Sequence, residues 1–377
     1  MKSMKKLVLV AFVLLASVMV LVGCKMEPEG PQGQKVYKFT SEPRILSDYK
    51  SPNNTDSEWT YVAFGDWPQT IKDKDVIVDE TKGLQMGMFT YYLGSDGNHY
   101  VKVTANPYKE GYTYSDTSGV TVGSDVYFKV EPIVWRVLTD DYKVPGEDGE
   151  LQRTGQALLL AENILTGGIP YYVDVNTRTI TGAGTKDGEQ DTVYPNNYKY
   201  STIRAWLNGL VVVKSDNVNE NDFTYDSKGF LQTAFTETAG NFIAPTIVDN
   251  SPRSSSDAEE EVEKATDYAC ENTIDKIFLL STQEATKLDY GFAEWNQYGK
   301  DNTRVRFTTD YAKATGAGQD SPETESYGGW WWVRSPSYNN VSKARVFNYI
   351  GDLIPHVVNL TYEGVVPALC VSASDIK

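Results

Sequence analysis

Apolar and polar residues follow three different patterns along the chain. Residues 7–22 are almost entirely apolar, residues 25–57 are mostly polar with four prolines, and from Trp59 onward short apolar runs are separated by Gly, Asn and Asp. Short apolar runs bounded by such turn residues are typical of β-strands. We therefore expect an apolar leader over 1–23, a flexible tether over 24–57 and a globular domain over 58–377.

The clearest strand patterns lie in the first half of the domain. Residues 91–93 and 99–103 are rich in aromatic and β-branched side chains, and the Asp-Gly turn between them predicts a hairpin. Residues 126–138 form a long strand pattern that contains Pro132, and residues 157–161 are apolar throughout, as in a strand buried on both faces. These runs predict a largely antiparallel sheet.

Helices are expected to be few and short. Residues 201–209 begin with Ser201, a preferred N-cap, and end with Gly209, a residue that commonly follows a helix. Residues 281–284 have the spacing of a capping box, and two further helices are predicted over 229–238 and 256–270. Because strands are followed by helices and then by strands again, the order favours a single α+β domain.

Eight motifs in a fixed order make the chain similar to a known family. In this order they resemble uncharacterised bacterial extracytoplasmic domains of spirochaete and clostridial surface proteins, over about residues 59–371. That family usually ends in Gly-Val-Arg-Pro-Ala-Leu, and this chain has Val366 at the arginine position, so the polar contact of that arginine is not expected here. The motifs are VAFGDWPQ at 62–69, PIVWRVL at 132–138, ALLL at 157–160, STIRAWLN at 201–208, KIFLLS at 276–281, TDYA at 309–312, WWVRSP at 331–336 and GVVPAL at 364–369.

The resembled family has no assigned reaction, so the resemblance implies a location and a fold more than an activity. Its C-terminal part, a Trp-containing strand followed by loops and a closing strand, is similar to C-type-lectin-like domains of the formylglycine-generating kind. The resemblance thus implies one C-type-lectin-like domain at the bacterial cell envelope. Because one fold hosts many functions, the function has to be argued from the site.

The N-terminal residues resemble a bacterial lipoprotein signal. Lysines at positions 2, 5 and 6 precede the apolar run, and Leu21-Val22-Gly23-Cys24 is similar to a lipobox, in which the peptide is cut before the cysteine and the thiol is acylated. We expect lipidation at Cys24, a membrane anchor and an extracytoplasmic location, at the cell surface or in the periplasm. A plain signal peptide and an N-terminal anchor helix are the alternatives.

The charge of the chain limits its partners. Removing residues 1–23 takes away three lysines, so the formal net charge changes from −16 to −19. Such an acidic protein is not expected to bind nucleic acid, because phosphates are neutralised by basic patches. Anionic lipid also repels it, so we expect membrane contact through the N-terminal lipid alone. The acidity is compatible with Ca²⁺, although no EF-hand spacing is present, and we expect no other cofactor.

Two cysteines remain besides Cys24. In an oxidising compartment Cys270 and Cys370 are candidates for a disulfide bond. The alternative is that Cys370, which lies in an apolar run predicted to be a buried strand, is a small core residue. The spacing does not decide between the two interpretations.

Three consecutive tryptophans precede Arg334 in a predicted strand. Side chains alternate along a strand, so Trp330 and Trp332 share one face and Trp331 takes the other. We favour a core strand that is covered on both faces, with Arg334 held by a buried carboxylate or by carbonyl groups. The alternative is an exposed tryptophan that stacks on a sugar or a cation.

The loops around the last strands contain the candidate ligand-binding residues. Tyr, Asn and Ser give contact area and hydrogen bonds at low entropy cost and are favoured in binding surfaces, although turns use the same residues. Surface loops on a rigid scaffold are also where binding residues concentrate. The candidates are Trp331, Tyr338, Asn339, Asn340, Asn348, Tyr349, Asp352 and His356.

Catalytic motifs are scarce. The chain has only two histidines, His99 and His356, which excludes a His-rich metal site and an HExxH helix. No G-x-S-x-G elbow and no phosphate-binding glycine loop is present. We therefore predict a non-catalytic recognition module for a glycan or protein ligand. The alternatives are an envelope carbohydrate hydrolase that uses a carboxylate pair and a purely structural surface lipoprotein.

Overall fold

The computed structural model describes residues 38–53, 59–146, 150–180, 183, 192–214, 221–256, 259–293, 303–319 and 328–376. The predicted leader, Cys24 and the first part of the predicted tether lie outside these residues. In the described part of the chain, no helix has both the length and the apolar character needed to cross a membrane.

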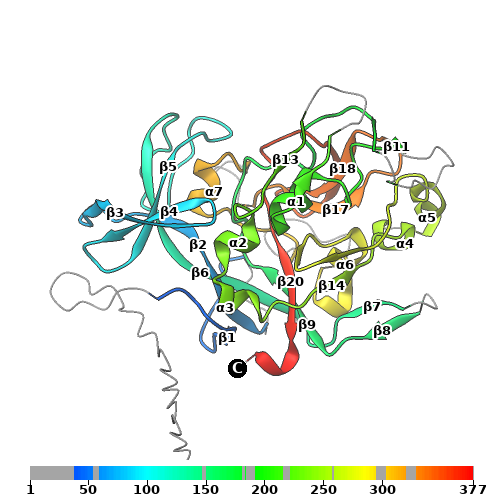
Figure 1. Ribbon diagram of the computed structural model, residues 1–377, viewed down its shortest axis with the longest axis horizontal. Coiled ribbons are helices and arrows are strands. Elements are labelled where there is room, and N and C mark those ends of the chain that lie inside the picture. Colours follow the sequence, from blue (N-terminus) through cyan, green and yellow to red (C-terminus); the bar gives the residue numbers. More distant parts are fainter. Residues whose placement is uncertain are drawn as a thin grey trace, which may run out of the picture.

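A nine-stranded sheet forms the centre of the fold (Figure 1). Its strands run in the order β16-β20-β9-β6-β5-β4-β3, and β2 pairs with β6 and with β1. All pairings between these strands are antiparallel. The strands are β1 Arg44–Ile45, β2 Tyr61–Ile71, β3 Val78–Met86, β4 Phe89–Gly94, β5 His99–Thr104, β6 Asp125–Thr139, β9 Gln156–Ala161, β16 Ile277–Phe278 and β20 Ala368–Ser372.

The long strand β6 connects two regions of this sheet. Its first residues pair with β5 and its last residues with β9, while β2 runs along the opposite edge. Pro132 lies opposite Asp66, next to a register shift in the β2 ladder, where the missing N–H of a proline is tolerated. The strand predicted over 126–138 is therefore confirmed, and β4 and β5 form the predicted hairpin.

Smaller antiparallel sheets flank the central one. Near the C-terminus, β17 Trp331–Pro336, β18 Lys343–Phe347 and β19 Leu353–Val357 form a three-stranded sheet that carries most of the predicted ligand-binding residues. The described two-stranded pairs are β7 Lys143–Pro145 with β8 Leu151–Arg153, β10 Arg178–Thr179 with β11 Thr192–Val193, β12 Val211–Val212 with β13 Phe223–Thr224, and β14 Thr246–Val248 with β15 Thr273–Asp275.

The described helices are short and their caps match the prediction in two cases. The Ser201 side chain caps α1, which ends at Gly209 in the left-handed conformation, and α6 begins with the predicted capping box. The region 229–238 forms two helices because the chain is extended at Phe235. The helices are α1 Thr202–Asn208, α2 Phe230–Ala234, α3 Glu237–Gly240, α4 Pro252–Ser255, α5 Glu259–Ala265, α6 Thr282–Ala285 and α7 Asp310–Ala314, with 3₁₀ turns η2 Leu288–Tyr290 and η3 Ala373–Asp375.

The core is rich in tryptophan. Five tryptophan side chains are at most 1% exposed and belong to one cluster of buried residues, which also includes residues of β2, β9 and β20. Burial of side chains of this size is a large stabilising contribution, about 3–5 kcal/mol each relative to alanine. The C-terminal strand β20, red in Figure 1, lies between β9 and β16 in the central sheet. The five residues are Trp67, Trp135, Trp206, Trp331 and Trp332.

Residues 38–53 pack against the domain, although the sequence pattern predicts a flexible tether up to residue 57. β1 pairs with β2 at the edge of the central sheet. Ser51 and Asn53 are buried, and both hydrogen-bond to the carboxylate of Glu162. These described residues, which precede the predicted boundary at residue 58, are therefore packed against the domain.

The observed architecture is a mixed fold with antiparallel sheets and a few short helices. This confirms the α+β class that the order of patterns predicts. The three-stranded sheet of β17, β18 and β19 lies beside the central sheet in Figure 1, and its loops and strand ends form the surface on which the candidate site is built.

Candidate functional site

The predicted ligand-binding residues lie at both ends of the three-stranded sheet. The turn between β17 and β18 holds residues 338–340, and the turn between β18 and β19 holds residues 348–352. Because these turns lie at opposite ends of the strand β18, they are separated by roughly 16 Å. The candidates therefore do not form a single surface.

The asparagine side chains of these turns form hydrogen bonds with nearby groups of the same turn. Asn340 Oδ1 accepts from the N–H of Ser342 at 2.9 Å, and Asn348 Oδ1 accepts from the N–H of Asp352 at 2.9 Å. Asn339 Oδ1 accepts from a serine hydroxyl of its own turn at 2.8 Å. These are the local bonds through which Asn closes a turn. These asparagines therefore stabilise the turns in which they lie.

Tyr338 packs against helix α5. The guanidinium of Arg345 lies 5.2 Å from the ring centroid, and the ammonium of Lys264 lies 5.5 Å from it. Arg345 also pairs with Glu261 at 3.3 Å. Cation–π contacts of this kind fix an aromatic ring against its neighbours. Tyr338 therefore fastens the β17–β18 turn to α5.

Trp331 is a core residue, which corrects its predicted role as a ligand-binding candidate. Trp331 and Trp332 are both 0% exposed. The Trp331 ring packs against Phe347 with centroids 4.9 Å apart, and its Nε1–H donates to the Arg304 carbonyl at 3.0 Å. A ligand does not reach a fully enclosed ring. The interpretation of this segment as a core strand covered on both faces is confirmed.

Arg334 is held by a buried carboxylate and by carbonyl groups, as the core interpretation predicts. Its Nη1 donates to Glu284 Oε2 at 2.5 Å and its Nη2 to Oε1 at 3.1 Å, and the Arg334 side chain is 1% exposed. Burial would raise the pKa of Glu284, but Arg334 outweighs it and holds that pKa below its usual range. The pair is therefore ionised and belongs to the framework.

Four partly exposed aromatic residues form a connected surface, which we call the aromatic group: Tyr108, Trp330, Tyr349 and Tyr362. Trp330 is central, and its ring centroid lies 5.8 to 6.1 Å from the centroids of the other three. All three contacts are edge-to-face, a favourable geometry for aromatic pairs. Tyr108 is 42% exposed and the other three are half-buried, so aromatic faces reach the surface.

Two glycines allow Trp330 to lie at the centre of this group. A Cβ atom on Gly318 would come within 2.6 Å of the Trp330 ring, and one on Gly364 within 3.0 Å of the Trp330 carbonyl oxygen. The Trp330 N–H donates to the Gly318 carbonyl at 3.3 Å, and the Gly364 N–H donates to the Trp330 carbonyl at 2.7 Å. The backbone of Trp330, just before β17, is thus hydrogen-bonded to two different loops.

His356 extends the aromatic group and contacts a buried carboxylate. Its ring centroid lies 6.2 Å from that of Tyr362. Its Nδ1 forms a short hydrogen bond with Oε1 of Glu363, and the side chain of His356 is 22% exposed whereas that of Glu363 is 0% exposed. Burial raises the pKa of Glu363, and the contact with His356 opposes that rise. A polar, titratable pair therefore borders the aromatic surface.

Sequence reasoning included Tyr349 and His356 but missed Tyr108, Tyr362 and Glu363. Tyr108 is more than 200 positions from Trp330, and no local pattern indicates a contact over such a separation. A signal for Glu363 existed in its position directly before the motif 364–369, whose first residue bridges to Trp331 of β17.

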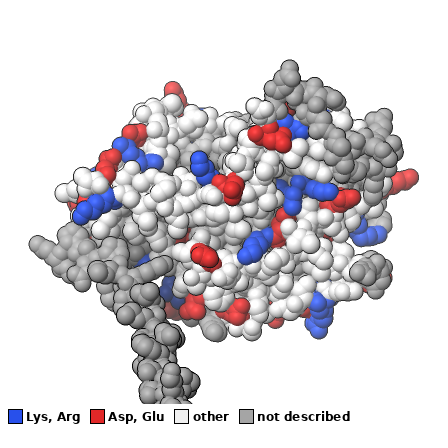
Figure 2. Space-filling view, viewed as in Figure 1, with Lys and Arg blue, Asp and Glu red and all other residues white. Residues whose placement is uncertain are grey.

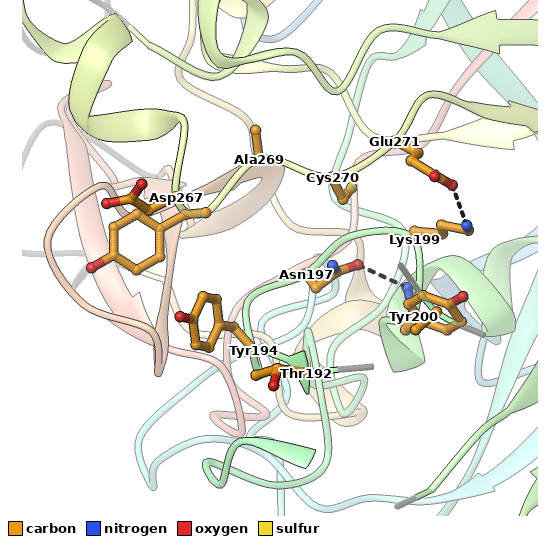
Figure 3. Close-up of a pocket in the computed structure, with 11 residues that line it drawn as sticks. Thr192, Tyr194, Asn197, Lys199, Tyr200, Asp267, Ala269, Cys270 and Glu271 are labelled. Atoms are coloured by element: carbon orange, nitrogen blue, oxygen red, sulfur yellow. Dashed lines mark hydrogen bonds and ion pairs between the residues drawn. The ribbon is translucent and has the colours of Figure 1, made fainter. Parts of the chain in front are cut away.

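A separate pocket, which we call the tyrosine pocket, lies between the segment before α1 and the segment after α5 (Figure 3). Its volume is about 290 Å³. Tyr194 lies on one side, and Lys199 and Glu271 form an ion pair at 2.5 Å on the other. The ring centroids of Tyr194 and Tyr268 are 5.8 Å apart. Aromatic faces with a few polar groups suit a small polar molecule. The lining also includes Thr192, Asn197, Tyr200, Asp267 and Cys270.

Of the two interpretations of the cysteines, the candidate disulfide is not formed, and Cys270 and Cys370 are both free thiols. Cys370 is 0% exposed and lies in β20, which agrees with its alternative interpretation as a small core residue. Cys270 lines the tyrosine pocket, and burial raises the pKa of its thiol to about 11. A protonated thiol is a poor nucleophile, so Cys270 is a neutral part of the pocket wall.

Charge does not mark a docking surface on the face shown in Figure 2, where acidic and basic side chains are interspersed. Among the residues that the structure describes, no group of three His, Cys, Asp or Glu side chains could hold a metal ion.

Fold and surface together define a sheet-rich α+β domain with a tryptophan core and an aromatic surface group. The chain belongs to a family described as a domain of unknown function, DUF6273, whose model matches residues 154–373. The match begins just before β9 and ends just after β20, so it includes Trp330, His356 and Glu363 and excludes Tyr108. Comparison with curated proteins found no match, and comparison with solved structures found none.

Proposed function

We propose that the protein is an extracytoplasmic, lipid-anchored recognition module that binds a carbohydrate at the aromatic group and does not catalyse a reaction. The observation that carries this proposal is the aromatic group itself, in which connected rings reach the surface around Trp330. Aromatic faces stack on the apolar faces of sugar rings, while tyrosine hydroxyls supply hydrogen bonds. His356 adds a polar group at the edge of this surface.

The fold and the family signature are part of the same proposal. We assign the domain to the C-type-lectin-like kind and the signature WWxRSP followed by GVxPAL to surface proteins of spirochaetes and clostridia. The closing strand β20 in the central sheet and the adjacent Trp-containing strand β17 support this assignment. Superposition of an experimentally determined structure on C-type-lectin-like domains tests it, and a different strand order would reject it.

Binding to a glycan array tests the proposed function. The protein is the soluble chain 24–377 carrying Cys24→Ser, which keeps the segment 38–53 that packs against the domain. We expect reproducible binding to a restricted set of glycans that are recovered unchanged. A blank array contradicts the proposal, and release of shorter products favours the hydrolase alternative.

Trp330→Ala is expected to weaken glycan binding at least about tenfold, because it removes the central ring of the aromatic group. Tyr268→Ala is the matched control, since Tyr268 is a half-buried tyrosine that lines the tyrosine pocket and lies outside the aromatic group. The control is expected to bind like the wild type. Loss of binding in the control alone would move the site to the tyrosine pocket.

Anchoring is proposed to depend on Cys24. In cells that produce the full chain, the wild type is expected in the membrane fraction and Cys24→Ser in a soluble extracytoplasmic fraction, because the acyl chains are lost. Fractionation followed by immunoblotting measures this. If both proteins remain with the membrane, the N-terminal segment anchors the protein without lipidation.

A further inference from the structure

A buried carboxylate with one unsatisfied oxygen lies directly behind the aromatic group. The side chain of Glu363 is 0% exposed, and its Oε2 has no hydrogen-bond partner in the described part of the chain. Burying an ionised carboxylate is costly unless it is paired, because its hydration is lost. The other carboxylate oxygen, Oε1, contacts the Nδ1 of His356. The two side chains therefore act as a pair.

We propose that Glu363 positions His356 as a hydrogen-bond acceptor for a hydroxyl group of the bound carbohydrate. This inference rests on the proposed function and names the polar group that selects the ligand. A carboxylate oxygen accepts from Nδ1–H, and in a neutral imidazole this leaves Nε2 without a proton and with a free lone pair. His356 is the residue that meets the ligand, and Glu363 is a positioning residue.

The imidazole is partly open to solvent. The side chain of His356 is 22% exposed, and its Nδ1 faces the buried Glu363, so Nε2 is the ring nitrogen that is left to meet a ligand. The Tyr362 ring lies 6.2 Å from the imidazole and 6.0 Å from Trp330. A sugar ring stacked on the aromatic group therefore has its hydroxyl groups beside the imidazole.

The basic residues of β18 lie on the other face of the three-stranded sheet. His356 pairs in register with Ala344 of β18, so both side chains share one face. Lys343 and Arg345 flank Ala344 and therefore point to the opposite face, where Arg345 pairs with Glu261 of α5. The basic residues of β18 thus do not compete for Glu363.

The loop after β19 supplies the groups that face the ring. Glu363 contacts Nδ1, and Tyr362 lies against the imidazole. Burial and the neighbouring Glu363 carboxylate raise the pKa of Tyr362 to about 12, so this tyrosine stays neutral at physiological pH. Glu363 is therefore the residue that holds Nδ1 and so decides which ring nitrogen carries the hydrogen.

The first experiment measures the tautomer of His356 in the free protein, so it needs no ligand. The chain has only two histidines, which makes the signals simple to assign. Nitrogen NMR of the soluble chain 24–377 with Cys24→Ser and ¹⁵N-labelled histidine reports the tautomer of each ring. We expect the Nδ1–H tautomer for His356 at neutral pH. His99, which is 8% exposed and stacks on Phe39 at 5.0 Å, is the internal reference. The Nε2–H tautomer at His356 would overturn the proposal.

Two amide substitutions distinguish the roles of the two ring nitrogens. The amide of His356→Gln reaches the place of Nε2 and offers an acceptor oxygen there, whereas the amide of His356→Asn reaches only the place of Nδ1. On the glycan array at neutral pH, His356→Gln is expected to bind within about twofold of the wild type, and His356→Asn at least about fivefold more weakly. Equal binding by the two variants contradicts the proposal.

Glu363→Gln tests the positioning role. An amide both donates and accepts, so the variant is expected to show both His356 tautomers by NMR. Its melting temperature is not expected to fall at neutral pH. A carboxylate whose folded pKa is raised contributes stability below its unfolded pKa and loses that contribution as the pH rises through the folded pKa. A single unchanged tautomer would remove Glu363 from the positioning role.

The outcomes separate this inference from the proposed function. A blank array overturns the proposed function, and with it the hydrogen bond from a carbohydrate hydroxyl to His356. Glycan binding with the Nε2–H tautomer, or equal binding by His356→Gln and His356→Asn, overturns the inference alone.

Discussion

Glu162→Gln is expected to lower the free energy of unfolding by about 3–5 kcal/mol, the range for removing one partner of a buried ion pair. Glu162 and Arg136 are both 0% exposed, and Arg136 donates to the carboxylate through Nε at 2.9 Å and Nη2 at 2.6 Å. Arg306 is also 0% exposed, and burial lowers its pKa to about 9. One carboxylate thus balances two buried guanidinium groups, and a neutral amide leaves both uncompensated.

The same carboxylate holds the N-terminal segment. Ser51 donates its hydroxyl to Glu162, and Asn53 Nδ2 donates to the Glu162 carbonyl at 2.8 Å and to its carboxylate at 3.1 Å. Asn53 Oδ1 in turn accepts from the N–H of Phe307 at 2.7 Å. Weakening this junction is therefore expected to make residues 38–53 more sensitive to proteolysis in Glu162→Gln, which limited digestion measures.

The difference in stability between the wild type and Glu162→Gln is expected to shrink in acid. Burial would raise the pKa of Glu162, but Arg136 and Arg306 hold it below its usual value of 4.5. Because the folded pKa is the lower one, the stabilising contribution is present above the unfolded pKa and is lost as the pH falls through the folded pKa. Denaturant unfolding at neutral and acidic pH measures both effects.

Glu271→Gln is the matched control for burial. Glu271 pairs with Lys199 at 2.5 Å, but its side chain is 65% exposed, so solvent screens the pair. Its loss is expected to cost at most about 1 kcal/mol. Equal losses in the two variants would show that burial is not the reason for the importance of Glu162.

Arg334→Met is the second substitution for which we expect a loss of about 3–5 kcal/mol. It leaves Glu284 as a buried carboxylate with Tyr142, whose hydroxyl donates to it at 2.5 Å, but without a counter-charge. It also removes the bonds from Arg334 to the carbonyls of Leu279 at 2.7 Å and Asp249 at 2.8 Å. Denaturant unfolding measures the loss.

A double-mutant cycle isolates the Arg334–Glu284 interaction. The double variant Arg334→Met with Glu284→Gln is expected to lose less stability than the sum of the two single variants, because it leaves no buried charge unpaired. The expected coupling is about 1–3 kcal/mol, as for residues in one ion-pair network. Additive losses would show that the two side chains do not depend on each other for stability.

Elements with local signals could be predicted from the sequence. The helix α1 starts at a serine cap and ends at Gly209, and both signals lie within the element itself. The region 229–238 contains no local signal that ends a helix at Phe235, and the interruption between α2 and α3 depends on tertiary packing. Phe235 leaves the helix to pack against Phe64 at 5.0 Å, over Gly65, where a Cβ atom would lie 2.4 Å from the Phe235 ring. A distant contact therefore decides where that helix ends.

The candidate site and the N-terminal segment depend on long-range contacts that a local pattern does not contain. The alternation of side chains along β17 correctly predicted a core strand around Trp331. The aromatic group joins Tyr108 to Trp330, and the junction of Asn53 with Glu162 spans 109 positions. Ser and Asn in a polar segment are typical of a tether, and only their buried partner shows that they are part of the fold.

The packed N-terminal segment has a mechanical consequence under the anchoring that we propose. Residues 38–50 make separate contacts with the domain, such as the N–H of Thr40 with Asp66 at 2.7 Å and the short strand β1, and we expect these to break one after another when the chain is pulled from its N-terminal side. The contacts of Ser51 and Asn53 with Glu162 are enclosed, and we expect them to resist longer. Fully extended, residues 38–50 span at most roughly 45 Å. The segment would therefore act as an extensible element in series with the proposed N-terminal anchor.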